Sequence, residues 1–411
     1  MNELIDRPAS LAALRRWRER PVIKVVTGVR RCGKSTLLEL FQQELIAGGV
    51  APDHIVSLNL EDFALAHLGE ASALHQYITA RLAPSGTTYV FIDEVQLVDQ
   101  FERVVNSLQL RPQADLYVTG SNARMLSGEL ATLLSGRYVE IELQPLSLAE
   151  FAQARRDRAG AAEDLSPAGL YASYLRFGGF PLVQDLIPDL RASQDYLDGI
   201  VSTVLLKDVA VRQNVSSAAM LRDVTGFLFQ NVGNLTSLRR VSDSLRSAGR
   251  SPSPNTVESY LTGLIDAYLL YPVERWDVKG LRRLSGPAKY YCVDPALRAS
   301  LVGNTGGDIG HVLENLVFLE LHRRHGRVRI GHSSGGEIDF LAGEGVDLAY
   351  YQVAASVHDP ATLARELGPL QAVRDHRPKF LLTLDPEPPA THDGIVQRPV
   401  VEWLLEDDRQ V

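Results

Sequence analysis

The chain contains 411 residues, of which 45% are hydrophobic and 22% charged, so it is long enough for about two to four globular domains with buried cores. A formal net charge of −8 at pH 7 excludes a protein that grips nucleic acid with its whole surface, although it leaves room for a local basic patch. Only two cysteines occur, Cys32 and Cys292, which are too few for a disulfide framework and favour a reducing, cytoplasmic location.

The N-terminal residues include acids and lack a long apolar run, so no signal peptide is expected. The chain also has no stretch of about 18 apolar residues. We therefore expect neither a membrane span nor a membrane partner.

Residues 1–152 alternate short β-branched runs with helical patterns, which is typical of a parallel sheet covered by helices on both faces. An amphipathic helix is expected at Ser35–Ile46, where Leu37, Leu38, Phe41 and Leu45 share one side. Strands are expected at Val22–Thr27, Ile55–Leu60, Tyr89–Ile92, Leu116–Thr119 and Tyr138–Leu143.

The segment GVRRCGKS at Gly28–Ser35 fits the phosphate-loop pattern G-x-x-x-x-G-K-[ST], between the first expected strand and the first expected helix. Its glycines let backbone N–H groups approach phosphate oxygens, and the helix N-terminus favours negative charge. Lys34 is predicted to contact the β- and γ-phosphates, and the Ser35 hydroxyl to bind Mg²⁺. Arg30 and Arg31 are expected to point outward, toward phosphate or a partner. The residues of this segment predicted to bind the nucleotide are Gly28, Val29, Arg30, Arg31, Cys32, Gly33, Lys34, Ser35 and Thr36.

The motif YVFIDEVQ places two acids directly after the third expected strand. Ligands bind outside the carboxyl ends of parallel strands, so Asp93 is predicted to hold Mg²⁺ there, through water. Glu94 is predicted to act as the general base that polarises the attacking water. A solvated turn is the alternative for this pair.

Two further polar positions follow the later strands. Ser121 and Asn122, after the fourth strand, are candidates for sensing the γ-phosphate, with a turn or a helix N-cap as the alternative. Arg137 follows a helical stretch just before the fifth strand and could stabilise transition-state charge in the nucleotide site of a neighbouring subunit. An ordinary surface or ion-paired arginine is the alternative. The catalytic role of Arg137 would require a homo-oligomer.

Residues 153–285 are predicted to be mostly helical, after an exposed linker at Ala154–Pro167. Two helices, Leu238–Leu245 and Asn255–Ala267, are separated by a turn rich in Gly, Ser and Pro and are followed by the apolar run Tyr268–Val273. A helix, a turn, a second helix and a strand are the outline of a winged helix.

Residues 286–411 return to mixed structure. The elements expected there are helices at Val312–Arg323 and Thr362–Arg374, and strands at Val328–Gly331, Ile338–Ala342, Ala349–Val353 and Lys379–Leu384. The chain is thus predicted to have three parts: 1–152, 153–285 and 286–411.

These motifs resemble a group of bacterial and archaeal predicted ATPases that pair an AAA+-like domain with a C-terminal domain of unknown function related to the PD-(D/E)xK nuclease fold. The resemblance implies an α/β P-loop ATPase fold, then a helical and winged-helix-like region, then a restriction-endonuclease-like domain. It also implies that the base of the nucleotide is adenine. The segments that carry it are GVRRCGKSTLL (28–38), NLED (59–62), FIDEVQ (91–96), TGSNARML (119–126), SGRYVEIELQPLSLAEF (135–151), RFGGFP (176–181) and LENLVFLELHRR (313–324).

The nuclease fold places a Glu on its first helix, an Asp on a strand, and (E/Q)-x-K on the next strand. This chain offers Glu314, Asp339 and Gln352, which together could hold one metal ion. Ala354 occupies the lysine position, so the resemblance favours a binding or structural remnant over an active nuclease. Alternatively, Glu314 pairs with Arg323 or Arg324, and Asp339 lies on the polar face of a strand.

Two basic clusters could contact DNA phosphates, although solvated or interdomain faces are the alternative. The second helix of the expected winged helix lacks basic residues and is better suited to packing than to base readout. The two clusters are Arg239, Arg240, Arg246 and Arg250, and Arg323, Arg324, Arg327 and Arg329.

Three functions follow from these patterns. The first is an ATPase that uses Mg²⁺ and couples hydrolysis to conformational change, acting on DNA or protein. The second is a nucleotide-gated regulator or scaffold with little turnover, and the third is an ATP-dependent nuclease.

Overall fold

The computed structural model describes residues 4–123, 136–158, 163–213, 215, 217–247, 249–303 and 308–406. The chain divides into two compact units. Unit 1 consists of residues 1–145 together with Asp266–Tyr268, and unit 2 consists of residues 146–265 and 269–411.

Unit 1 is built on a parallel five-stranded sheet with the strand order β2-β3-β4-β1-β5. All five predicted strands are confirmed, with ends that differ by one or two residues. The elements in chain order are α1 (Pro8–Trp17), β1 (Ile23–Thr27), α2 (Lys34–Ala47), β2 (Ile55–Asn59), α3 (Ala71–Thr79), β3 (Thr88–Asp93), α4 (Phe101–Gln109), β4 (Ala114–Thr119) and β5 (Tyr138–Glu142). Short 3-10 turns lie at Pro52–His54, Phe63–Leu68 and Val95–Leu97.

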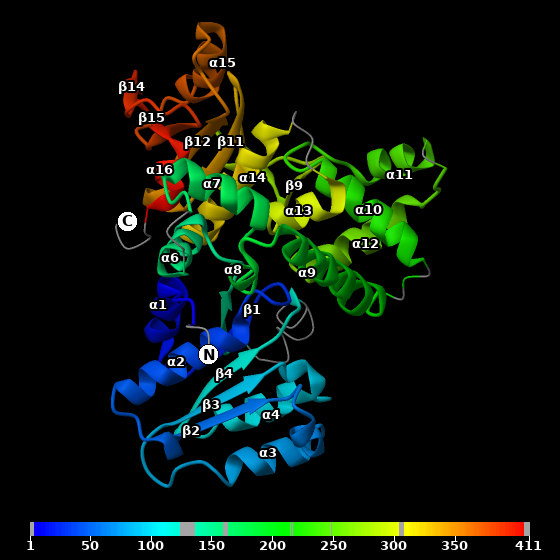
Figure 1. Ribbon diagram of the computed structural model, residues 1–411, viewed down its shortest axis with the longest axis vertical. Helices are drawn as coiled ribbons and strands as arrows, with labels where there is room; N and C mark the ends of the chain where they lie inside the picture. Colours follow the sequence, from blue (N-terminus) through cyan, green and yellow to red (C-terminus); the bar gives the residue numbers. More distant parts are fainter. Residues whose placement is uncertain are drawn as a thin grey trace. The chain divides into compact units, whose positions relative to one another are not determined.

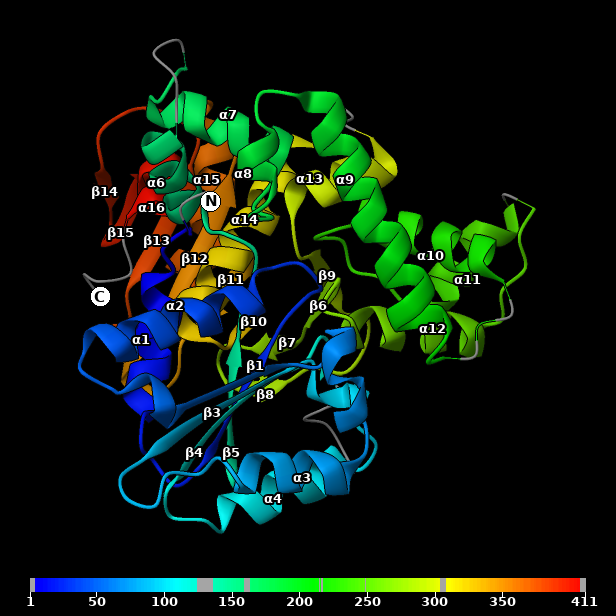
Figure 2. The same ribbon diagram turned by 60° about the horizontal axis from the view of Figure 1, so that its bottom comes forward.

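Both faces of this sheet are covered, as Figure 2 shows, by α2 on one side and by α3 and α4 on the other. Alternate residues of β3 serve the two faces, because side chains along a strand point to opposite sides. Val90 and Ile92 belong to the cluster that packs against α3 and α4. Phe91 stacks on Tyr117 and meets Phe41 of α2 at 6.4 Å between ring centroids.

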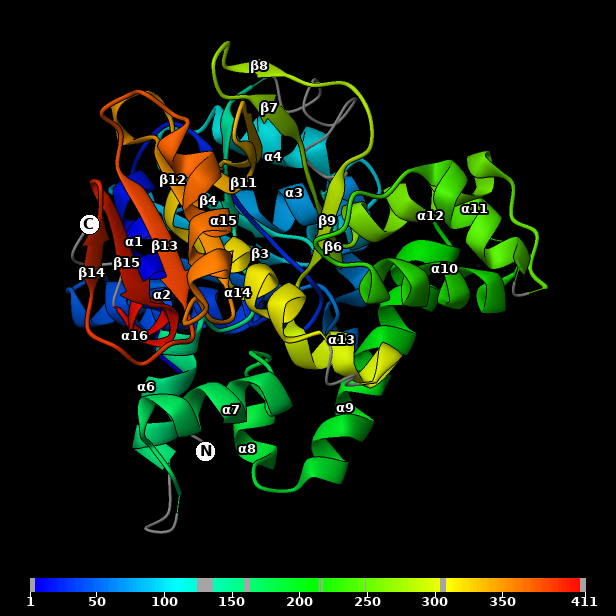
Figure 3. The same cartoon turned by 90° about the horizontal axis from the view of Figure 1, so that it is seen from above.

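The amino-terminal half of unit 2 is helical. Its elements are α6 (Leu148–Arg158), α7 (Pro167–Phe177), α8 (Val183–Leu186), α9 (Leu190–Thr203), a π-helical segment (Val204–Ala210), α10 (Ala218–Gln230), α11 (Leu238–Ser247) and α12 (Pro254–Asp266). Helices α10, α11 and α12 group together in all views (Figures 1 to 3).

The expected exposed linker at Ala154–Pro167 is wrong over its first part, because α6 continues to Arg158. Ala154 is 2% exposed and Arg155 3% exposed, and the Arg155 guanidinium pairs with Glu163. A buried, paired arginine keeps this charged segment helical. Residues 159–162 of the expected linker lie outside the described residues.

The carboxyl-terminal half of unit 2 contains an eight-stranded mixed sheet with the order β14-β15-β13-β12-β11-β10-β7-β8, and a two-stranded sheet of β6 and β9. Figure 3 shows β12, β13, β15 and β14 side by side. The strands are β6 (Leu270–Val273), β7 (Arg275–Asp277), β8 (Arg282–Arg283), β9 (Lys289–Cys292), β10 (Val328–Ser333), β11 (Gly336–Ala342), β12 (Ala349–Ala354), β13 (Lys379–Thr383), β14 (Ala390–His392) and β15 (Ile395–Pro399). The helices are α13 (Pro295–Val302), α14 (Ile309–His325), α15 (Pro360–Gln371) and α16 (Val400–Leu405), with a 3-10 turn at Gly345–Asp347.

The helices and strands named above for residues 286–411 are present, and β9, α13, β14, β15 and the start of α15 were not anticipated. Helix α15 begins at Pro360 because Asp359 caps it, accepting the backbone N–H of Thr362 at 2.9 Å. The division at residues 152 and 285 stays a prediction.

Candidate functional site

The loop between β1 and α2 has a conformation that only its own residue types permit. Gly28 has a φ of +137°, and a Cβ there would lie 2.1 Å from the backbone oxygen of Leu143. Gly33 has a φ of +104° and Arg31 one of +71°, so the chain turns sharply before α2 begins at Lys34. The glycine spacing of the motif is therefore a geometric requirement of this turn.

Lys34 lies under the loop with only 5% of its surface exposed. Its ammonium donates hydrogen bonds to the backbone oxygens of Gly28 at 3.0 Å and Val29 at 3.2 Å. Over the part of the chain that the structure describes, no carboxylate oxygen lies within ion-pair distance of its Nζ atom. The positive charge is thus held in place by neutral dipoles and is not neutralised.

The other loop residues divide into an inner and an outer set. Val29 and Cys32 are buried, and burial raises the pKa of the Cys32 thiol. Ser35 and Arg31 are exposed, and Thr36 is half-buried. Arg30 pairs with Glu61 at 3.4 Å. The exposed face of the loop therefore carries a hydroxyl and two guanidinium groups.

A residue that the sequence analysis missed anchors this loop from behind. Arg7, 5% exposed, donates to the backbone oxygen of Cys32 at 3.3 Å and to that of Gln144 at 2.7 Å. One side chain thus ties the loop to the segment after β5. No local pattern marks Arg7, because its partners lie 25 and 137 residues away.

Asp93 ends β3 and Glu94 follows it, at the same edge of the sheet as the loop, with β4 between β3 and β1. The hydroxyl of Thr119, the last residue of β4, donates to Asp93 Oδ1 and accepts the backbone N–H of Glu94 at 2.9 Å. Glu94 has a left-handed backbone with a φ of +55°, and its Oε2 accepts a hydrogen bond from Gln96. Thr119, also missed by the sequence analysis, fixes both acids.

Ser121 and Asn122 follow β4 and are 1% and 4% exposed. The backbone N–H of Gly120 donates to Val26 O at 3.1 Å, which ties this segment to β1 beside the loop. The Ser121 hydroxyl is buried without a hydrogen-bond partner in the described parts of the chain. Residues 124–126 of the TGSNARML segment lie outside the described residues.

Arg137 is not brought to this edge of the sheet. Its backbone oxygen accepts the N–H of Ile23 at 2.9 Å, at the start of β1, whereas the loop follows the end of that strand. Since β1 has five residues and a strand rises about 3.3 Å per residue, the Cα atoms of its first and last residues are about 13 Å apart. The exposed Arg137 therefore lies at the opposite edge of its own sheet. The helical stretch expected before it falls mostly within residues 124–135, outside the described residues.

A segment far along the chain completes unit 1. The Tyr268 hydroxyl donates to Glu140 Oε1 at 2.9 Å, and the hydroxyl of Thr27 donates to the same oxygen at 2.7 Å. Thr27 is the residue immediately before the loop. Glu140 thus links Tyr268 to the end of β1.

In unit 2, Glu314 of α14 does not pair with Arg323 or Arg324, so that alternative is wrong. Both arginines pair with Glu320, each at 2.7 Å. Glu314 instead accepts from Lys289 Nζ at 2.9 Å and from the Tyr291 hydroxyl at 2.6 Å.

The three residues of the nuclease-like pattern do lie near one another. Asp339 Oδ2 accepts the backbone N–H of Val353 at 2.8 Å, and Gln352 Oε1 accepts that of Asp339 at 3.3 Å. Burial, and next the charge of Glu314, raise the pKa of Asp339 well above its ordinary value. Gln352 also donates to Glu366 at 2.9 Å.

Lys289 of β9 supplies the cation of this cluster. Its Nζ atom lies 2.9 Å from Glu314 and 2.8 Å from Glu337, and its side chain is 7% exposed. Burial opposes the charge, but the neighbouring carboxylates outweigh it and raise the pKa of Lys289 above its ordinary value. The carboxylates of Glu314 on α14 and Glu337 on β11 therefore share one lysine, which no sequence motif pointed to.

Comparisons with known proteins agree with this geometry. Residues 20–152 match a family model described as an AAA domain, and residues 168–308 match one described as a domain of unknown function (DUF8612). An uncharacterized protein of Haemophilus influenzae is 37% identical over 405 residues, which are 98% of this chain and 99% of that protein. One of Methanocaldococcus jannaschii is 29% identical over 306 residues, covering 74% of this chain and 67% of that protein.

Among solved structures, the Walker-type ATPase of Pyrococcus abyssi superposes with a TM-score of 0.50 at 16% identity, covering 72% of this chain and 95% of that chain. The parallel sheet with its glycine loop is the nucleotide-binding fold of P-loop NTPases. Among the described residues, no helix combines the length and the apolarity needed to cross a bilayer.

Proposed function

We propose that this chain, which belongs to the same family as the Haemophilus influenzae relative and matches an AAA-domain model over residues 20–152, binds ATP with Mg²⁺ and hydrolyses it at the loop between β1 and α2. The observation that carries the proposal is the buried Lys34 ammonium, which is held by two backbone oxygens and has no carboxylate partner in the described chain. A cation in this setting is ready for an anionic triphosphate.

The residues around Lys34 offer groups that can bind the phosphates of a nucleotide and its Mg²⁺ ion. Backbone N–H groups from Gly28 to Thr36 cradle the phosphates, with the side chains of Arg30 and Arg31 at the outer face. Ser35 and Asp93 offer hydroxyl and carboxylate oxygens, the ligand types that Mg²⁺ prefers. The metal ion, when bound, would neutralise charge on the phosphate oxygens.

Glu94 is the proposed general base, which takes a proton from the water that attacks the γ-phosphorus. Its backbone N–H and the Asp93 carboxylate share the Thr119 hydroxyl. Thr119 is therefore a positioning residue for both acids. Ser121 and Asn122, at the end of the same strand β4, are proposed to respond to the presence of the γ-phosphate.

Arg137 would act on a neighbouring subunit. Its place at the far edge of its own sheet removes it from its own nucleotide, so any contact with a γ-phosphate requires a second copy of the chain. We propose a homo-oligomer in which Arg137 of one copy approaches the loop of the next.

For unit 2 we propose a winged-helix-like part followed by a nuclease-like sheet. The support for the first is the sequence of α10, α11, α12 and the antiparallel pair β6 and β9, with a bridge between Thr236 and Ala288. The support for the second is the nearness of Glu314, Asp339 and Gln352. Because Lys289 lies inside this cluster, we propose that the cluster has a structural role and that the nuclease-like sheet does not cleave nucleic acid. Nucleic acid remains the proposed partner, through the basic clusters.

Phosphate release from ATP with Mg²⁺ tests the proposal directly. Lys34→Ala should abolish release and ATP binding measured by calorimetry, whereas Lys279→Ala, which removes an exposed lysine of the β7–β8 turn, should change neither. Equal hydrolysis by the wild type and Lys34→Ala would reject the site. Tight binding without turnover would reject hydrolysis and leave a nucleotide-gated regulator.

A further inference from the structure

The two arginine clusters of unit 2 separate into side chains with structural partners and side chains that share a groove. Arg250 pairs with Asp223 at 2.8 Å, and Arg240 donates to the backbone oxygen of Leu235 at 3.1 Å. Arg323 and Arg324 are committed to the nearly buried Glu320. One arginine of the first cluster, Arg239, and two of the second, Arg327 and Arg329, line the same groove.

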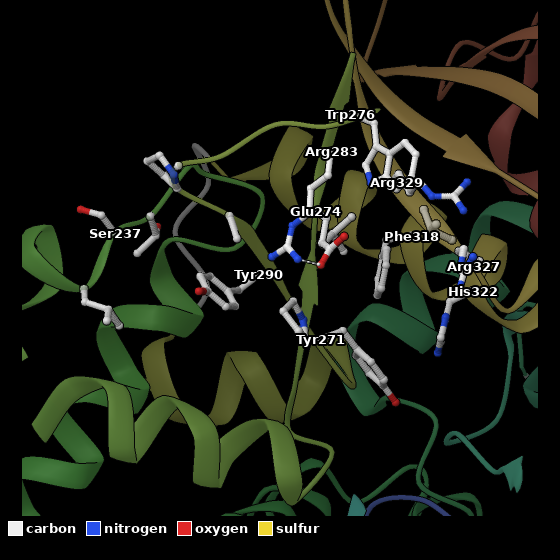
Figure 4. Close-up of a pocket in the computed structure, with 18 of the residues that line it drawn as sticks. Ser237, Tyr271, Glu274, Trp276, Arg283, Tyr290, Phe318, His322, Arg327 and Arg329 are labelled. Carbon is white, nitrogen blue, oxygen red and sulfur yellow. Dashed lines mark ion pairs between the residues drawn. The ribbon is translucent and has the colours of Figure 1, made fainter. Parts of the chain in front are cut away.

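This groove has a volume of about 1110 Å³ and is formed by α11, α14 and the strands β6 to β10 (Figure 4). It lies within unit 2. A fourth arginine, Arg283 of β8, also lines it, and Glu274 is the one acidic residue among the lining residues that the structure describes. The groove is therefore basic in a chain whose net charge is −8.

The ion pairs made by these arginines are weak enough to exchange for another anion. Arg283 lies 3.2 Å from Glu274, with side chains 69% and 47% exposed. Arg239 lies 3.7 Å from Asp243, with side chains 87% and 52% exposed. Arg327 shares Glu344 with Arg329; the Arg327 and Glu344 side chains are 64% and 58% exposed, whereas the Arg329 side chain is 12% exposed and is the more firmly held. Exposed pairs of this kind contribute little to stability, so a phosphate can replace the carboxylate.

Aromatic rings alternate with these charges. In Figure 4 the pair of Arg283 and Glu274 lies between Tyr290 on one side and Phe318 and His322 on the other. Arg329 lies over the ring of Trp276, 4.5 Å from its centroid. Phe318 is 2% exposed and forms part of the groove wall, whereas Trp276 and Tyr290 are half-buried and line the groove.

We propose that this groove binds a single-stranded segment of nucleic acid. Its phosphates would pair with the arginines, and its unpaired bases would stack on the open rings, the combination by which proteins hold single strands without reading their sequence. A duplex keeps its bases stacked inside and would leave the rings unused. The proposal rests on the nucleic-acid partner proposed above but not on ATP hydrolysis. The residues assigned to it are Arg239, Arg283, Arg327, Arg329, Trp276 and Tyr290.

Fluorescence anisotropy of the full chain with labelled oligonucleotides, in the absence of ATP, tests the groove. Single-stranded DNA or RNA should bind more tightly than duplex DNA of the same length, and the two single strands tell which backbone is preferred. Each phosphate contact contributes about −0.7 to the slope of log K against log salt for single strands. Four arginines therefore predict a slope of up to about −3.

Helix α11 offers a matched pair of variants, because Arg239 and Arg246 both pair with Asp243 and only Arg239 lines the groove. Arg239→Ala should weaken binding and make the salt slope shallower by about 0.7, whereas Arg246→Ala should leave both unchanged. Equal effects of the two substitutions, or none from either, would overturn the proposal.

Tyr290 tests the stacking. Tyr290→Leu should weaken single-strand binding about tenfold, and Tyr290→Phe should retain it because the ring remains. Tighter binding of duplex than of single strands, or no binding of either at low salt, would also overturn the proposal. Lys34→Ala should bind the oligonucleotides like the wild type, so failure of the groove and failure of the ATP site are distinguishable.

Discussion

Lys34 of unit 1 and Lys289 of unit 2 are both nearly buried lysines, yet their surroundings differ. Two neutral backbone oxygens hold Lys34, whereas two carboxylates hold Lys289. The first charge has no carboxylate partner among the described residues, as the proposed nucleotide site requires, and the second is paired within the protein itself. The partner of a buried cation, more than its burial, therefore distinguishes a binding site from a structural cluster.

The largest expected effect is on the rate of ATP hydrolysis and compares one acid of each unit, Glu94 and Glu314. Glu94→Gln should lower the rate of phosphate release by about 10²- to 10⁴-fold while ATP binding persists, because only the general base is lost. Glu314→Gln makes the same chemical change in unit 2 and should leave the rate unchanged. Single-turnover assays measure the rates and calorimetry the binding. A comparable loss of rate in both variants would contradict the assignment of Glu94.

The two lysines themselves should differ in stability. Lys289→Met leaves the partly exposed Glu314 and Glu337 without their cation, which should lower the free energy of unfolding by up to about 3 kcal/mol, the lower end of the range for buried pairs. Lys34→Met removes only hydrogen bonds to carbonyls and should cost about 1 kcal/mol. Urea unfolding followed by circular dichroism measures both. If Lys34→Met were as destabilising as Lys289→Met, the contrast between the sites would be lost.

Asp294 extends the comparison to a buried carboxylate, which is held by backbone N–H groups. Asp294 is fully buried and accepts from Gly179 N at 2.6 Å and Leu297 N at 2.8 Å, and burial raises its pKa from 3.8 to about 6. A raised pKa in the folded state means that the native protein binds the proton more tightly than the unfolded chain. The stability from this proton is therefore present below about pH 4 and lost as the pH rises through 6.

Asp294→Asn cannot titrate and should lack this component. Relative to the variant, the wild type should lose about 3 kcal/mol of unfolding free energy between pH 4 and pH 7, from a shift of about two pKa units. Urea titrations at several pH values give the difference between the two curves. If the free energies of unfolding of the wild type and the variant changed with pH in parallel, the raised pKa would not belong to Asp294.

The sequence predicted those features whose cause is local. The glycines at positions 28 and 33 and the strand before Asp93 follow from spacing and periodicity, and the five-stranded sheet follows from the alternation of strands and helices. RFGGFP was noticed only as a resemblance. Its two glycines are required by residues that lie far away in the sequence. A Cβ on Gly178 would lie 2.4 Å from Asp294 Oδ1, and one on Gly179 would lie 2.4 Å from Leu146 O.

The groups that position the sites were missed for the same reason. Arg7, Thr119 and Lys289 act on residues 25 to 137 positions away, and nothing in their own neighbourhood distinguishes them from other arginines, threonines and lysines. Pairs of side chains that meet only in the folded protein leave no periodic pattern in the sequence, unlike helices and strands. Pattern reasoning therefore singled out the residues that we propose to be reactive in unit 1, but not the residues that hold them in position.

The hydrogen bond between Tyr268 and Glu140 has a practical consequence. The nucleotide-binding unit is not one continuous stretch of sequence, since it recruits three residues that follow Ile265. A polypeptide cut after Pro145 would keep the entire sheet and the glycine loop. It would lose Tyr268, whose hydroxyl donates a hydrogen bond to Glu140 together with that of Thr27. Such a fragment would change the hydrogen bonding of Glu140 beside Thr27, the residue before the glycine loop, so its affinity for nucleotide would not represent that of the intact protein.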